Sequence, residues 1–190
     1  RIGGHSYTMS QADFAPALER AITRAIAGIT SITGLKRLSG GASQETWSFD
    51  GTGPNGTTPL ILRRAPFGKT IPRTATAVPL ATEAKVIRLA EKAGVPVPPV
   101  PYVLEDTDDV GSGYIMGRIE GETIARKILR DPEFADARPK LARQCGRILA
   151  NIHAVDKAQV GDLNVVSPRA QFDQYRTILD TYDYPHPVFE

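Results

Sequence analysis

We predict an α+β fold for this chain: a small lobe with a five-stranded, mostly antiparallel sheet and helices, followed by the first helices of an α-helical lobe. Short β-branched, aromatic and aliphatic runs recur through residues 9–116, accompanied by two helical patterns. The proline-rich residues 96–101 favour an extended path and exclude a helix, so the chain crosses there to a new strand. Apolar residues follow helical spacing within residues 122–190, which makes residues 117–121 the expected connection.

The first helix is expected over residues 11–28, with Ser10 as its N-cap. Residues 1–8 lack an initiator methionine and contain Gly3-Gly4-His5-Ser6, so we interpret them as the remnant of an expression tag before a native Met9. They take no part in the functional argument. The apolar face of the helix comprises Phe14, Leu18, Ile22, Ala25 and Ile29.

A glycine turn lies between two strand-like runs, residues 35–38 and 46–49. Its adjacent Gly40 and Gly41 let the backbone approach a ligand and direct successive N–H groups at an anion without a side chain in the way. In kinase-like folds such a loop covers the nucleotide phosphates, and Ser43 belongs to the same loop. Taken alone, the pattern fits an ordinary hairpin turn equally well.

The next elements follow in the order that a nucleotide site requires. After a polar turn over residues 51–58, residues 60–64 form a third strand with a cationic end, and residues 80–93 show helical spacing up to Gly94. In protein kinases a cation on the third strand contacts the α- and β-phosphates and pairs with a glutamate on the next helix. Arg63 and Glu83 are expected to fill these two roles.

These elements together resemble the aminoglycoside phosphotransferase-like family of small-molecule kinases, from about Leu35 to the C-terminus. Arginine instead of lysine at position 63 is most similar to the branch related to the kinase domains of some acyl-CoA dehydrogenase proteins. An arginine is always charged, and its planar fork can bind phosphate or pair bidentately with Glu83. The residues that carry the resemblance are 38–41, 62–66, Glu83, 94–98, 114–116 with Arg118, Glu120 and Gly121, and 149–156.

The resemblance implies ATP as phosphate donor and a small-molecule hydroxyl acceptor, with Mg²⁺ in the complete protein. Two more strands are expected, residues 102–104 and 114–116, joined by an acidic turn that we interpret as a solvent-exposed hairpin tip. Residues 117–121 then form the hinge, where an adenine edge needs one acceptor and one donor. By the pattern of the family these are the Gly117 carbonyl and the Ile119 N–H, with Met116 behind them. From the residues alone, a plain interdomain linker explains this segment nearly as well.

Phosphoryl transfer also needs a carboxylate that orients the acceptor hydroxyl and further oxygen ligands for magnesium. In the family these lie on a His-Gly-Asp-x-x-x-x-Asn loop and a later aspartate. Residues 160–164 do not match this loop, because Val160 replaces the histidine and Asn164 follows Asp162 too closely. We therefore expect no catalytic residue and no magnesium ligand in this chain, which would end before the catalytic loop and transfer no phosphate. The alternative that the sequence leaves open is a non-catalytic, kinase-like binding or scaffolding module.

The start of the helical lobe contains two amphipathic segments. The first is expected to be a core helix on which Cys145 is buried and unreactive. The second continues this lobe or forms part of an acceptor pocket. The apolar positions are Leu141, Cys145, Ile148, Leu149 and Ile152 in the first segment, and Phe172, Tyr175, Ile178 and Tyr182 in the second.

The composition limits the classes of binding partner and the cellular compartments that we expect for this chain. The chain has 190 residues and a net charge of +2 with scattered basic residues, which does not favour a nucleic-acid partner. No apolar run approaches the length that spans a membrane, and no signal peptide is visible. Cys145 is the only cysteine, which excludes a disulfide within the chain and favours the reducing cytoplasm.

Two other nucleotide-binding patterns and a histidine metal site are excluded. Residues 68–70 end like a P-loop, but Arg63 stands where its first glycine is needed and Pro72 follows where a helix should begin. A dinucleotide-binding fold is excluded because the glycine pair lacks the G-x-G-x-x-G spacing and leads into a strand. The histidines, at positions 5, 153 and 186, are too dispersed for a metal site.

Overall fold

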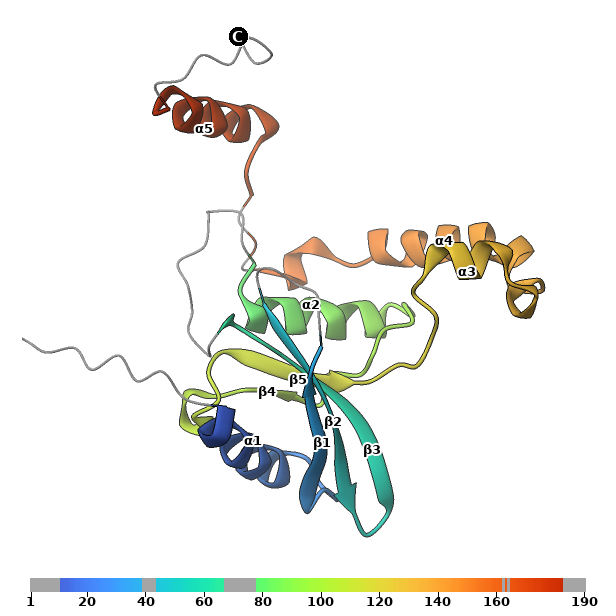
Figure 1. Ribbon diagram of the computed structural model, residues 1–190. Helices are drawn as coiled ribbons and strands as arrows, with labels where there is room; N and C mark the ends of the chain where they lie inside the picture. The colour runs from blue at the N-terminus through green and yellow to red at the C-terminus, as the bar shows by residue number, and fades with distance from the viewer. Residues whose placement is uncertain (1–10, 39–43, 67–77, 162, 164, 183–190) are drawn as a thin grey trace, which may run out of the picture.

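The computed structural model describes residues 11–38, 44–66, 78–161, 163 and 165–182 (Figure 1). Within this part of the chain, five strands form one antiparallel sheet in the order β1-β2-β3-β5-β4. The predicted α+β class with a five-stranded antiparallel sheet is therefore confirmed. The strands are β1 (Ser31–Arg37), β2 (Glu45–Gly53), β3 (Gly56–Arg64), β4 (Tyr102–Val103) and β5 (Gly113–Gly117).

The β2–β3 hairpin is longer than the sequence indicates. Glycine, threonine and proline over residues 51–58 predict a loop, yet Gly51 pairs with Thr58 and Gly53 with Gly56. Only two residues remain for the turn, and Gly56 adopts a φ of 108°, which glycine reaches without strain. The backbone ladder thus continues to the turn through glycines, whose strand propensity is low, and through Thr52, Thr57 and Thr58, whose strand propensity is high.

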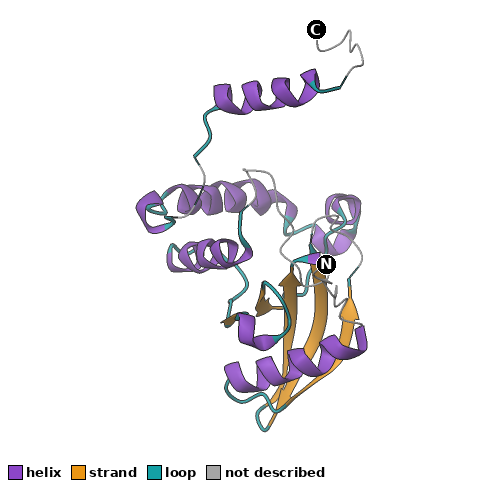
Figure 2. Ribbon diagram, turned by 90° about the vertical axis from the view of Figure 1, so that its left-hand side faces the viewer, coloured by secondary structure: helices purple, strands orange, loops and turns teal. Residues whose placement is uncertain are grey.

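The helix α1 (Gln11–Ala25) covers one face of the sheet (Figure 2). It ends three residues earlier than expected, since Gly28 takes a φ of 85° and turns the chain toward β1. The core of this face is apolar on both sides, and the rings of Phe14 and Trp47 lie 5.1 Å apart between centroids. Its buried members include Phe14, Leu18 and Ile22 of α1 and Trp47, Phe49, Leu62 and Ile115 of the sheet.

The opposite face of the sheet receives the helix α2 (Leu80–Lys92), which Figure 1 shows on the far side of the strands from α1. Leu80 and Ala84 of α2 pack with Val100 and Tyr114 in a second buried cluster. As predicted, the helix ends at Gly94, which adopts a φ of 76° and donates its N–H to the Glu91 carbonyl. This arrangement fixes the first turn of α2, including Glu83, against β3 and β5.

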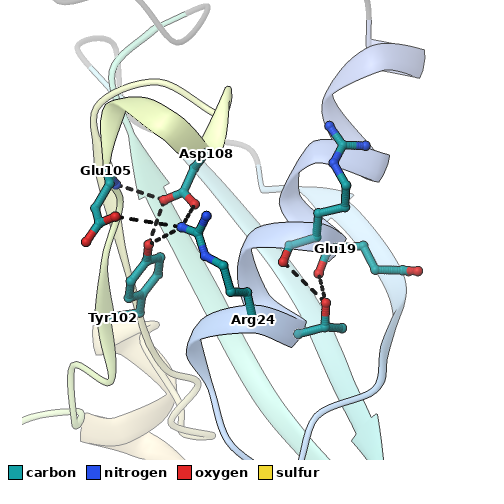
Figure 3. A network of polar contacts seen from close by, with 7 residues as sticks. Glu19, Arg24, Tyr102, Glu105 and Asp108 are labelled. Atoms are coloured by element: carbon teal, nitrogen blue, oxygen red, sulfur yellow. Dashed lines mark hydrogen bonds and ion pairs between the residues drawn. The ribbon is translucent and has the colours of Figure 1, made fainter.

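The acidic turn between β4 and β5 is exposed at residues 105–107 and 109, as the sequence suggests, but Asp108 departs from this expectation. Residues Asp106–Asp108 form a short 3₁₀ helix, η2, and the Asp108 side chain is fully buried. Arg24 Nη2 of α1 lies 2.6 Å from Asp108 Oδ1, and the Tyr102 hydroxyl donates to Asp108 Oδ2 at 2.8 Å (Figure 3). Since the acidic turn supplies the partner of Arg24, it fastens α1 to the sheet.

The helical segment that follows β5 makes few contacts with the sheet. It comprises α3 (Ala125–Arg130), α4 (Arg138–His153) and α5 (Pro168–Asp180), none of which has a buried residue. Large apolar side chains such as Leu149 and Phe172 are exposed, and so is Cys145, contrary to expectation. The helical spacing predicted α4 and α5 but not the short α3, whereas burial requires an opposing surface that the described residues do not provide.

Within the described residues, polar contacts join this segment to α2 and to the turn that follows it. Asn151 Nδ2 of α4 donates to the Gly94 carbonyl at 3.2 Å, and Lys85 Nζ of α2 donates to the Val160 carbonyl at 3.1 Å. The helix α2 consequently lies between the sheet and the beginning of the helical part.

Candidate functional site

The sheet face that carries α2 presents three successive rows of side chains. Strand pairing places Arg63 beside Thr46 and Tyr114, then Ile61 beside Ser48 and Met116, and then Pro59 beside Asp50. Because side chains alternate along a strand, all of these positions share one face, opposite the α1 core. The first row is charged, the second is mostly apolar, and the third borders the end of β5.

Arg63 and Glu83 meet in the first row. Arg63 Nε lies 2.9 Å from Glu83 Oε1, and both side chains are partly exposed, at 34% and 29%. The Nε–H is buried and lacks hydrogen-bond geometry toward any described group, so the contact is an ion pair. The structure thus brings together the cation of the third strand and the carboxylate of the next helix. A role of either residue toward a nucleotide remains a prediction.

Tyr114 completes this group. Its hydroxyl donates to the same Glu83 Oε1 at 2.9 Å, while its ring is 1% exposed within the second cluster. Burial raises the pKa of Tyr114, and the nearby Glu83 carboxylate raises it further, whereas Arg63 opposes the shift. Tyr114 therefore stays protonated and acts as a hydrogen-bond donor to the carboxylate.

The second row leads to the end of β5. Ile61 is buried and Met116 half-buried, which gives an apolar patch beside the charged row. The strand β5 continues through Gly117, whose N–H donates to the Pro99 carbonyl at 2.9 Å. A Cβ at position 117 would lie only 3.1 Å from the Pro99 ring, so glycine suits this close approach. The side chain of Ile119 is exposed.

Arg118 extends from the end of β5 back across the sheet. Its Nη1 donates to Ser48 Oγ at 3.0 Å and forms an ion pair with Asp50 Oδ1, also at 3.0 Å. Its Nε donates to Glu120 Oε1 at 2.9 Å, and its backbone N–H donates to the Pro59 carbonyl. Arg118 thereby links the segment after β5 with both strands of the hairpin.

Arg64, next to Arg63, points to the opposite face. Its Nε lies 2.8 Å from Glu45 Oε2, and its guanidinium carbon lies 3.7 Å from the centre of the Phe14 ring. Burial lowers the pKa of Arg64, while the hydrogen bond and charge of Glu45 raise it. An arginine keeps its charge under such opposing influences, so this pair is a structural contact of the α1 face.

Comparison with known proteins decides the family. The sequence model of the phosphotransferase enzyme family, APH, matches residues 34–183. The chain belongs to this family. None of the curated proteins is similar enough in sequence to count as a relative.

A solved structure agrees with the APH assignment at the level of the fold. It is that of a candidate aminoglycoside phosphotransferase from Ralstonia eutropha JMP134, with a TM-score of 0.63 and 20% sequence identity. The alignment covers 90% of this chain and 48% of the other, so the chain spans about half the length of that APH-like protein. The finer placement beside acyl-CoA dehydrogenase-associated kinase domains stays a prediction.

Several residues of the predicted APH site lie outside the described residues. These are Gly40, Gly41 and Ser43 of the glycine turn. Asp162 and Asn164, which the sequence analysis excluded from the site, also lie outside the described residues. In the part that the structure does describe, no cluster of histidine, cysteine and acidic residues fits a metal ion. Over the same residues, no helix is both long and apolar enough to cross a bilayer.

The sequence analysis did not assign a role to Tyr114, Asp50 or Arg118. The alternation of side chains along a strand could have identified Tyr114. It stands two residues before Met116 in the same strand and therefore lies on the same face of the sheet. The link between Arg118 and Asp50 joins residues 68 positions apart, and only the strand order brings them together. The kinase pattern and the family resemblance therefore indicated Arg63, Glu83 and Met116 as candidates, but not the polar contacts around them.

Proposed function

We propose that this chain is the nucleotide-binding portion of a small-molecule phosphotransferase that transfers the γ-phosphate of ATP to a hydroxyl acceptor. The observation that carries the proposal is the ion pair between Arg63 of β3 and Glu83 of α2, at 2.9 Å. In phosphoryl-transfer enzymes a cation in this position neutralises the negative charge of the phosphates. Membership of the APH family supports the same reaction class.

The base would lie on the second row of the sheet face. Ile61 and Met116 offer apolar surface next to Arg63, and the chain after Gly117 leaves the sheet as an extended segment. The Ile119 N–H has no hydrogen-bond partner among the described residues, so it is free to donate to the edge of a base. In this proposal the phosphates lie toward Arg63 and the base lies toward Gly117 and Ile119.

The residues described here perform binding and orientation only. They supply no set of carboxylates that suits Mg²⁺, so no step of the proposal passes through that ion in this chain. The acceptor is a separate small molecule, and the proposal assigns neither its binding surface nor the group that removes the proton from its hydroxyl to a described residue. The expectation of weak nucleotide binding without turnover rests on the sequence, in which the catalytic loop of the family finds no match.

Calorimetric titration with ADP tests the proposal through Arg63→Ala. We expect the wild-type chain to bind ADP, and the variant to bind at least about tenfold more weakly, because a charged hydrogen-bond donor to phosphate is lost. Lys92→Ala is the control, since Lys92 is an exposed cation at the end of α2, the helix that carries Glu83, and far along that helix from the ion pair. Equal affinity of Arg63→Ala and Lys92→Ala would remove Arg63 from the phosphate site.

A further inference from the structure

We infer that Tyr114 is a positioning residue: it holds Glu83 so that Arg63 pairs through Nε alone and keeps both Nη groups available for a phosphate. The inference rests on the proposed function for the identity of the ligand. Its structural half, the control of Arg63 by Tyr114, can be tested separately.

The geometry centres on a single oxygen atom. Glu83 Oε1 lies 2.9 Å from Arg63 Nε and accepts the Tyr114 hydroxyl at 2.9 Å. The contact of Arg63 with Glu83 is made through Nε, and neither Nη atom of Arg63 makes a hydrogen bond with a described residue. Four N–H bonds of this guanidinium therefore remain uncommitted on the face that carries α2.

An arginine next to a lone carboxylate normally behaves differently. The planar guanidinium and the carboxylate match in shape, and they commonly form two parallel N–H···O bonds. Such a bidentate pair would direct an Nη group to Glu83. It would therefore reduce the number of N–H groups that Arg63 can donate to a ligand. The Tyr114 hydroxyl supplies the hydrogen bond that Glu83 would otherwise take from Arg63, and it restrains the carboxylate in its present orientation.

Tyr114 is suited to this task because its own position is fixed. It lies opposite Arg63 in the β3–β5 ladder, and its ring packs with Leu80 and Ala84 of α2. The hydroxyl is thus held between the strand that carries Arg63 and the helix that carries Glu83. A phenol whose pKa is raised by burial remains a donor throughout the neutral range.

Tyr114→Phe removes only the hydroxyl and leaves the buried ring, so the fold should persist. The first measurement is the ¹⁵N spectrum of the arginine side chains, with the Arg63 signals assigned from Arg63→Lys. In wild type we expect one exchange-averaged Nη signal for Arg63, because both Nη groups are free to rotate. In Tyr114→Phe we expect resolved, slowly exchanging Nη signals, because Glu83 is released to form a bidentate pair.

The second measurement compares ADP with adenosine by calorimetry. Tyr114→Phe should weaken ADP binding about fivefold and leave adenosine binding unchanged, because only the phosphate contact depends on the freed guanidinium. Adding Glu83→Gln to this variant should return the ADP affinity toward that of wild type, since a neutral amide does not hold Arg63 bidentately. A purely structural role of Tyr114 would weaken both ligands alike and would not be rescued.

Tyr102→Phe is the matched control, because the Tyr102 hydroxyl also binds a buried carboxylate, Asp108, but on the α1 side of the sheet. It should leave the Arg63 signals and the ADP-to-adenosine ratio unchanged. Resolved Nη signals already present in wild type, or Nη signals that Tyr114→Phe does not alter, would overturn the inference. If the Nη signals change as expected but wild type does not bind ADP, the positioning role stands and the proposed function fails.

Discussion

Arg118 Nη1 lies 3.0 Å from Asp50 Oδ1, across the intervening strand β3. The residue that follows β5 is thereby tied to β2, and Glu120 holds the same guanidinium at Nε. The path of the chain after Gly117 therefore depends on a side-chain contact as well as on the backbone ladder. If this segment is a hinge that binds a base, Arg118 restrains its mobility from the sheet side.

Removing this restraint should loosen the segment without unfolding the sheet. The backbone N–H of residue 118 donates to the Pro59 carbonyl. In Arg118→Ala we expect the hydrogen of this N–H to exchange with solvent about fivefold faster than in wild type. Hydrogen exchange followed by NMR measures this at single residues. Arg169→Ala, which removes the exposed ion pair with Asp173 on α5, serves as control and should change nothing at residue 118.

A charge exchange tests whether the electrostatic contact itself is responsible. Arg118→Asp and Asp50→Arg should each accelerate exchange at residue 118, since each places two like charges side by side. The double variant should recover part of the protection. Additive effects of the two substitutions would show that the Arg118–Asp50 pair does not restrain the segment.

Two phenylalanines should differ strongly in their effect on stability. Phe14 is 1% exposed between α1 and the sheet, whereas Phe172 of α5 is 58% exposed. We expect Phe14→Ala to lower the free energy of unfolding by about 3–5 kcal/mol and Phe172→Ala to leave it almost unchanged. Urea denaturation followed by the fluorescence of Trp47, the single tryptophan, measures both. Similar losses in the two variants would place α5 in a packed core.

The buried phenol of Tyr114 predicts a pH dependence of stability. Its pKa is raised in the folded chain above the unfolded value of about 10, so the folded state holds this proton more tightly. Its stabilising contribution is complete below about pH 10 and is lost as pH rises toward the folded pKa. Between about pH 9 and about pH 11, the free energy of unfolding should therefore fall more in wild type than in Tyr114→Phe. Denaturant titrations at the two pH values give this difference, and parallel losses would exclude Tyr114 as the source.

Catalysis gives a separate prediction. Incubation of this chain with ATP, Mg²⁺ and a panel of small alcohols should yield no phosphorylated product, because the sequence shows no match to the catalytic loop of the family and the described residues include no cluster that fits a metal ion. Product detection by mass spectrometry is sensitive to a single turnover. Rapid phosphorylation that Arg63→Ala abolishes would show that a catalytic base had been missed within these 190 residues.

The sequence predicted those features that depend on local pattern, such as the sheet face on which a side chain lies and the residue at which a helix ends. Arg63 and Arg64 are adjacent, yet period-two alternation sends one to the α2 face and the other to the α1 core, and the family pattern selects Arg63. The Gly94 stop of α2 was predicted from the same kind of local signal. These features depend on backbone periodicity and on the preference of glycine for positive φ.

Contacts between residues that lie far apart in the sequence could not be predicted from local patterns. The acidic turn between β4 and β5 resembles a solvated loop, and nothing local indicates that Asp108 meets Arg24 of the first helix. Cys145 lies at a typical core position of an amphipathic helix, yet it is exposed because no described element covers that face. Helical spacing shows which face is suited to burial, but whether an opposing surface is present depends on the tertiary structure.

The most direct test of the central claim is an NMR titration of the ¹⁵N-labelled wild-type chain with ADP. If the α2 face of the sheet binds the nucleotide, the Arg63 Nε signal and the Ile119 amide signal should shift together along one binding curve. Arg64 Nε, which lies on the opposite face with Glu45, should stay in place. Saturable shifts confined to other residues, or none at millimolar ADP, would contradict the account.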